Sequence, residues 1–91
     1  MASSYRFVVR GRVQGVGFRY VAVGQARSLG IAGWVRNRED GDVEGLASGA
    51  PEALEQLRGW LQHGPPAARV EALEWDESTD ETVGEGFVIR R

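Results

Sequence analysis

Apolar or small residues alternate with mostly basic ones from Tyr5 to Val13. The first set is Phe7, Val9, Gly11 and Val13, and the second is Arg6, Val8, Arg10 and Arg12. A period of two is typical of a strand with one buried face, so we predict a strand over this stretch. Beyond Gln14-Gly15-Val16-Gly17 the spacing changes to three and four residues. The positions that follow it are Phe18, Val21, Ala22, Gln25, Ala26 and Leu29. This spacing predicts a helix that Gly30 ends.

Two short runs, Ile31–Arg38 and Asp42–Ala47, flank the tripeptide Glu39-Asp40-Gly41. Glycine accepts the positive φ that tight turns require, and an Asp-Gly pair between two such runs therefore predicts a β-hairpin.

A second helix is predicted from Pro51, because proline is favoured in the first turn. Its apolar stripe consists of Leu54, Leu57, Trp60 and Leu61, and Gly64-Pro65-Pro66 ends it. A further strand is predicted from Val70 to Trp75, a loop over Ser78–Gly86 and a short closing strand over Phe87–Arg90.

The predicted order is therefore β-α-β-β-α-β with one more strand at the end. With right-handed crossovers, this order gives an α+β fold of the ferredoxin-like type, an antiparallel sheet with both helices on one face. With 91 residues the chain has room for one core, so we expect a single domain over residues 1–91.

The amino-acid composition excludes several kinds of catalytic and metal-binding site. The sequence has no cysteine and a single histidine, His63, which excludes thiolate catalysis, iron–sulfur clusters and cysteine- or multi-histidine metal sites. We therefore expect no metal and no cofactor. No apolar run approaches the roughly 20 residues of a membrane span, and the N-terminus lacks the apolar region of a signal peptide, so we expect a cytoplasmic monomer without a membrane partner.

Charge is distributed unevenly along the chain. All basic residues are arginines; residues 1–38 carry a net charge of +7 without a single acid, whereas residues 39–91 carry −9. A basic segment of this kind indicates an anionic ligand: a phosphate, a nucleic acid or an acidic protein.

The segment from Gln14 to Arg19 joins the first predicted strand to the first predicted helix. Amides at a helix N-terminus lack intrahelical partners and carry partial positive charge. Gly15 and Gly17 allow successive N–H groups to converge on an anion, and the guanidinium of Arg19 suits a tetrahedral dianion. We predict a phosphate cradle here; the alternative is a plain glycine turn. Asn37, near the end of a hairpin strand, is either a turn residue or an amide that positions a water molecule.

Both segments match ordered motifs of one family. Gly11–Arg19 resembles Gly-x-Val-Gln-Gly-Val-x-Phe-Arg of the acylphosphatase family, and Gly33–Glu44 resembles its second motif, Gly-Trp-Val-x-Asn-x-x-Asp-Gly-x-Val-Glu. The resemblance implies hydrolysis of a small-molecule acyl phosphate to a carboxylate and inorganic phosphate. It implies that Arg19 and the loop bind the phosphoryl group and that Asn37 orients the attacking water. The expected phosphate-binding loop consists of Gln14, Gly15, Val16, Gly17 and Phe18.

Other functions stay open at this stage. An RNA-binding module is one alternative, although the first strand offers no aromatic pair and the pI of 5.4 is unfavourable, so we expect no nucleic-acid partner. The N-terminal part of a hydrogenase-maturation protein has a similar loop, but that family continues into zinc-binding domains. A regulatory small-ligand module is the third alternative. For Arg10, Arg12, Arg36 and Arg38 we expect places on the solvent face or near the mouth of the site.

Overall fold

The computed structural model describes residues 3–79 and 84–91. Its elements are β1 (Ser3–Arg12), α1 (Phe18–Ser28), β2 (Ala32–Asn37), β3 (Val43–Gly49), α2 (Pro51–Leu61), β4 (Arg69–Glu77) and β5 (Phe87–Ile89). The predicted order of elements is confirmed, and their ends differ from the prediction by a few residues. Part of the predicted loop Ser78–Gly86, residues 80–83, lies outside the described residues.

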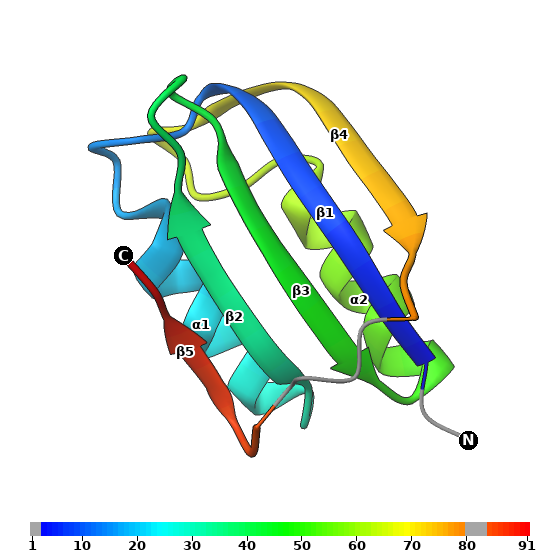
Figure 1. Ribbon diagram of the computed structural model, residues 1–91. Coiled ribbons are helices and arrows are strands. Elements are labelled where there is room, and N and C mark those ends of the chain that lie inside the picture. Colours follow the sequence, from blue (N-terminus) through cyan, green and yellow to red (C-terminus); the bar gives the residue numbers. More distant parts are fainter. Residues whose placement is uncertain (1–2, 80–83) are drawn as a thin grey trace.

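The sheet has the strand order β4-β1-β3-β2-β5, and both helices cover one of its faces (Figure 1). This is the ferredoxin-like α+β arrangement that the sequence predicts. The prediction of an antiparallel sheet holds for the first four strands but is wrong for the fifth, because β5 pairs with β2 in parallel. The sheet is therefore mixed. The parallel register follows from the path of the chain, which returns along the free edge of β2 after β4 has occupied the opposite edge.

The core lies between the sheet and the helices. Phe7 and Val9 from β1 and Val35 from β2 are almost fully buried there, and the helices add most of the apolar positions that their spacing predicts. The exception is Val21, which the helical spacing includes but which is 38% exposed. The helical contribution consists of Phe18, Ala22, Ala26, Leu54, Leu57 and Leu61. Strand alternation then turns Arg6 and Arg10 to the opposite, open face of the sheet.

The β2–β3 hairpin closes where Asp40-Gly41 predicts it. The Arg38 N–H donates to the Asp42 carbonyl at 2.8 Å, and the Gly41 N–H donates to the Arg38 carbonyl at 3.2 Å. The Asp40 carboxylate accepts a hydrogen bond from the Asp42 N–H at 3.0 Å, an arrangement that stabilises such turns. The turn brings the end of β2 next to the connection between β1 and α1.

Candidate active site

The connection between β1 and α1 is shaped by two glycines in the left-handed region. Gly15 has φ +74° and Gly17 has φ +77°, whereas Val16 between them is not in that region. Alternation of the sign of φ is typical of a nest, a concave turn in which successive N–H groups point to one side and favour an anion. A Cβ added at either glycine would meet no atom within 4 Å, so space is open beside the backbone at both positions.

Helix α1 begins directly after this nest. The Val21 N–H is bonded to the Gly17 carbonyl at 3.1 Å, so the amides of Phe18, Arg19 and Tyr20 come before the first helical hydrogen bond. Among the described residues no side chain caps this end, and the first turn holds no acidic residue. The partial positive charge of the helix N-terminus is therefore available to an anion.

Arg19 differs from Arg6, Arg10 and Arg36 on the sheet. It is half-buried in the first turn of α1, and among the residues that the structure describes no carboxylate pairs with it. Arg6, Arg10 and Arg36, in contrast, each contact a carboxylate. The guanidinium of Arg19 is thus free to pair with an anion at the nest.

Asn37 is the last residue of β2, and strand alternation decides where it faces. Its neighbours Arg36 and Arg38 reach Glu44 on the open face, so Asn37 between them is directed to the helix side. Its amide oxygen Oδ1 is buried and has no hydrogen-bond partner among the described residues. Buried polar atoms are nearly always hydrogen-bonded, and an exception of this kind indicates a site for water or a ligand.

These features meet in one pocket of about 120 Å³, lined by Val13, Gly15, Gly17, Phe18, Arg19, Tyr20 and Asn37. Five of the predicted site residues therefore lie together: Gly15, Gly17, Phe18, Arg19 and Asn37. The predicted loop residues Gln14 and Val16 do not line the pocket. Val13 and Tyr20 do line it, although the sequence prediction leaves them out. Tyr20 was detectable as a first-turn residue, and Val13 by its place directly before the loop.

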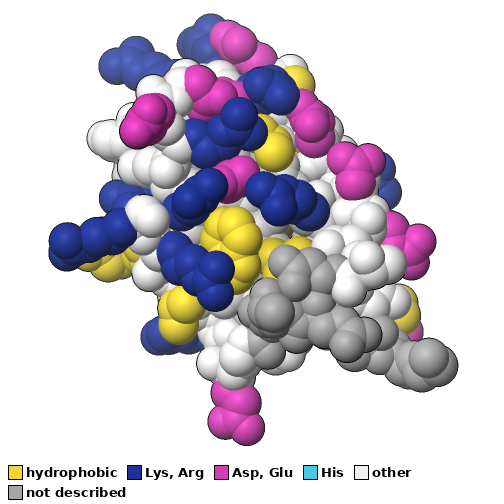
Figure 2. Space-filling view, in the orientation of Figure 1, with side chains coloured by type: hydrophobic (Ala, Val, Ile, Leu, Met, Phe, Trp, Pro, Cys, Tyr) yellow, Lys and Arg dark blue, Asp and Glu magenta, His cyan; other side chains and the backbone are white. Residues whose placement is uncertain are grey.

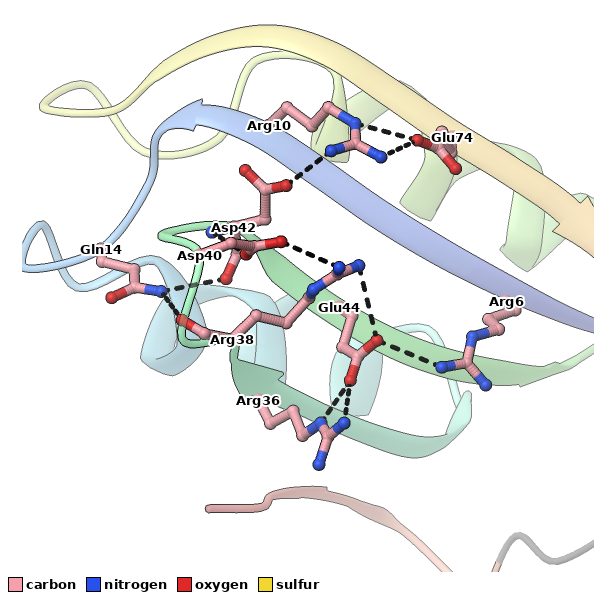
Figure 3. Close-up of polar contacts among 9 residues, drawn as sticks. All are labelled: Arg6, Arg10, Gln14, Arg36, Arg38, Asp40, Asp42, Glu44 and Glu74. Carbon is pink, nitrogen blue, oxygen red and sulfur yellow. Dashed lines mark hydrogen bonds and ion pairs between the residues drawn. The ribbon is translucent and has the colours of Figure 1, made fainter.

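The side chain of Gln14 reaches the β2–β3 hairpin (Figure 3). Its Nε2 donates to the Arg38 carbonyl at 2.7 Å and to the Asp42 carbonyl at 3.0 Å. The side chain of Val16 packs against the hydrophobic core instead. Any role of these two residues at the nest is thus confined to their backbone.

The open face of the sheet carries a network of arginines and carboxylates (Figures 2 and 3). Glu44 is only 3% exposed and pairs with Arg6 at 3.1 Å and with Arg36. Burial raises the pKa of Glu44, but hydrogen bonds and charge from Arg36 and Arg6 outweigh that effect, so its pKa is lowered overall. Arg36 and Arg38, which flank Asn37, are engaged in this network. They line a second pocket of about 480 Å³ together with Asn37, but they do not line the pocket that contains Arg19.

Arg10 also pairs with acids on the open face. Its guanidinium contacts Glu74 and lies 2.8 Å from Asp42. Trp34 is only 8% exposed, with the guanidinium of Arg90 at 4.8 Å and that of Arg36 at 5.8 Å from its ring centroid. The indole therefore packs under cationic side chains and presents no open ring for stacking on this face. The expected positions of Arg10, Arg12 and Arg36 on the solvent face are confirmed by their exposure, and Arg38 is half-buried.

Residues 3–79 and 84–91 hold no group of three or more His, Asp or Glu placed to bind a metal ion. In the same ranges no helix is long and apolar enough to span a membrane.

Comparison with known proteins decides the family. The model of the acylphosphatase family, described as "Acylphosphatase", matches residues 5–89. The chain belongs to the acylphosphatase family. This confirms the resemblance that the two sequence motifs indicate.

Individual relatives of the family agree along most of their length. An acylphosphatase of Paraburkholderia xenovorans is 48% identical over 84 residues, which cover 92% of this chain and 87% of that protein. One from Thermococcus kodakarensis is 54% identical over 71 residues, or 76% and 78% of the two chains. The crystal structure of acylphosphatase from Bacillus subtilis superposes with a TM-score of 0.92 at 41% identity, and the match covers 100% of both chains. The family and its fold are thus shown by sequence and by structure.

Proposed function

We propose that this chain hydrolyses acyl phosphates, with the nest and Arg19 binding the phosphoryl group and Asn37 orienting the attacking water. The observation that carries the proposal is the meeting of three features in one pocket: the left-handed glycines, the unpaired guanidinium of Arg19 and the orphaned Oδ1 of Asn37. Family membership supports the reaction, and the geometry supports the roles of the residues.

The proposed step is an in-line displacement at phosphorus. The water oxygen bonds to phosphorus, the bond between phosphorus and the acyl oxygen breaks, and the carboxylate leaves with the bonding electrons. One water proton passes to a phosphoryl oxygen, which yields dihydrogen phosphate. A carboxylate is a good leaving group, so positioning and charge stabilisation are the main demands on the protein.

Each residue meets one of these demands. Amides of the nest and of the first turn of α1, together with the Arg19 guanidinium, hold the non-bridging oxygens and their charge. Asn37 Oδ1 accepts a hydrogen bond from the water. This contact orients the water so that a lone pair of the water oxygen points at phosphorus. The proton does not need a separate base, because the substrate itself accepts it.

We further propose that the enzyme works as a monomer in the cytoplasm, without metal and without a nucleic-acid partner. The covered indole of Trp34 weakens the case for RNA on the open face, where stacking on exposed aromatic rings would be needed. Cell fractionation and gel filtration test the location and the oligomeric state.

The test of the proposed reaction is hydrolysis of benzoyl phosphate in ¹⁸O-enriched water, with a chelator present. We expect unchanged turnover in the chelator and the label in inorganic phosphate. Label in benzoate would show attack at the carbonyl carbon and contradict the proposal, as would a loss of turnover that added metal restores. Phosphate binding without any turnover would favour the regulatory alternative.

A further inference from the structure

The amide group of Gln14 links the loop of the nest to the β2–β3 turn. Its Nε2 carries two hydrogens, and both find carbonyl acceptors in that turn, at Arg38 and Asp42 (Figure 3). The two carbonyls are the same ones that close the hairpin, where they accept from Gly41 and Arg38. Each carbonyl oxygen has two lone pairs, so the side chain of Gln14 joins the turn without displacing its own hydrogen bonds.

The hydrogen bonds of Gln14 connect the backbone beside the nest to the backbone beside Asn37. Gln14 directly precedes Gly15, the first glycine of the nest, and Arg38 directly follows Asn37. Within the described residues, no other side-chain hydrogen bond joins residues 14–17 to residues 37–42. Asn37 Oδ1 has no hydrogen-bond partner in the part of the chain that the structure describes, so the position of this atom depends on the backbone of β2 and its turn.

The chemistry of Gln14 also argues against direct contact with phosphate. Both Nε2 hydrogens are engaged with the turn, which leaves only Oε1 as a free polar atom of the side chain. An amide oxygen is an acceptor and repels the oxygens of a dianion. The Gln14 side chain therefore binds the β2–β3 turn and has no free donor for the phosphoryl group.

We propose that Gln14 is a positioning residue that sets the distance and orientation between the phosphoryl-binding nest and Asn37. The inference rests on the proposed function, since it acts through the role of Asn37 in orienting water. In-line attack requires the reacting atoms to be held within a few tenths of an ångström, and a small misplacement lowers the rate strongly. Without the link, phosphate binds the nest normally, but water is no longer held in line.

The first test uses Gln14→Met, which keeps the length of the side chain and removes both donors. We expect kcat for benzoyl phosphate to fall on the order of 10- to 100-fold, while inhibition by inorganic phosphate changes by less than about twofold. A tenfold weaker inhibition with unchanged kcat would place Gln14 at the phosphate and overturn the proposal. Wild-type kcat in a folded Gln14→Met variant would overturn it as well.

A double-mutant cycle distinguishes positioning from a general loss of stability. If Gln14 acts through Asn37, the variant Gln14→Met/Asn37→Ala has the kcat of Asn37→Ala alone, within about threefold. If the loss in kcat of the double variant equalled the product of the two single losses, Gln14 would not act through Asn37. The proposed role of Asn37 itself would not be affected by that result. Full activity of Asn37→Ala by itself would instead overturn the proposed function.

A measurement on the wild-type protein covers the case in which Gln14→Met does not fold. The Gln14 side-chain NH₂ signals are followed by NMR while the protein is titrated with inorganic phosphate. We expect the backbone amide signals of Gly15 and Gly17 to shift on saturation, and the Gln14 NH₂ signals to stay within a small fraction of those shifts. Shifts of equal size at the Gln14 NH₂ group would show contact with the anion and contradict the proposal.

Discussion

Asn37, at the end of β2, lines the same pocket as Arg19, in the first turn of α1. One residue offers a neutral amide with a buried, unpartnered oxygen, and the other offers a cation without a carboxylate partner among the described residues. The fold therefore places a hydrogen-bond acceptor and a cationic donor in one pocket, where the proposed reaction needs an acceptor for water and a donor for phosphate. Within residues 3–79 and 84–91 neither group is satisfied, which is the arrangement that a substrate and its nucleophile can complete.

Replacing Asn37 should lower kcat without lowering the free energy of unfolding. Asn37→Ala removes a group that orients water, so kcat should fall about 10²- to 10³-fold while inhibition by phosphate is kept. Because the variant also removes a buried acceptor without a partner, the free energy of unfolding should stay unchanged or rise by up to about 1 kcal/mol. Steady-state kinetics and denaturant titration check both values. A loss of phosphate affinity with normal kcat would make Asn37 a binding residue.

The nest depends on backbone conformation that only glycine adopts readily. Gly17 has φ +77°, and alanine in the left-handed region costs about 1–2 kcal/mol. Gly17→Ala should therefore weaken inhibition by phosphate about tenfold or more, because the strained loop relaxes away from the nest geometry. Gly24→Ala, in the middle of α1, is the matched control.

The control variant Gly24→Ala is itself expected to change the free energy of unfolding. A Cβ at Gly24 would meet nothing within 4 Å, and alanine favours the helix over glycine by about 1 kcal/mol. We expect Gly24→Ala to raise the free energy of unfolding by about that amount and to leave phosphate inhibition unchanged. Equal phosphate inhibition in Gly17→Ala and the wild type would show that the nest does not bind the anion.

Glu44 should make stability depend on acid pH. Its pKa is lowered in the folded protein, so its stabilising effect is complete above the ordinary glutamate pKa of about 4.3 and is lost as pH falls through the folded value. At neutral pH, Glu44→Gln should lower the free energy of unfolding by about 1–3 kcal/mol, because it replaces the buried carboxylate between Arg6 and Arg36.

The difference between Glu44→Gln and the wild type should shrink as the pH is lowered below about 4. Glu74→Gln serves as the control, since Glu74 and its partner Arg10 are both exposed and exposed ion pairs contribute little to stability. Urea titrations between neutral and acid pH measure both variants. A Glu44→Gln difference that stays constant down to the lowest pH would mean that this carboxylate does not titrate below its ordinary range.

Much of the fold follows from local pattern. The alternation along β1, the helical spacing in α1 and the Asp40-Gly41 turn each depend on neighbouring residues, and all three appear where the sequence predicts them. The pocket could be predicted in part for the same reason. The first amides of a helix lack intrahelical partners, so a glycine-containing connection before a helix without a capping side chain leaves them available to a ligand.

Other features depend on contacts between distant segments, which spacing does not encode. The three residues of β5 cannot reveal which edge they join, and their parallel pairing with β2 was therefore missed. Gln14 belongs to the predicted loop, but its amide finds partners in the β2–β3 turn. Glu44 is charged yet buried, because arginines from two neighbouring strands surround it.

The central claim, that Arg19 holds the transferring phosphoryl group, is tested most directly by kcat/KM of Arg19→Ala on benzoyl phosphate beside Arg58→Ala. Arg58 carries the same charge on α2 and lies outside the pocket, paired with Glu55 at 3.7 Å. We predict that Arg19→Ala loses on the order of 10²–10⁴ in kcat/KM with an unchanged melting temperature, and that Arg58→Ala stays within about twofold of the wild type. Near-wild-type kcat/KM in Arg19→Ala, or an equal loss in both variants, would contradict the account.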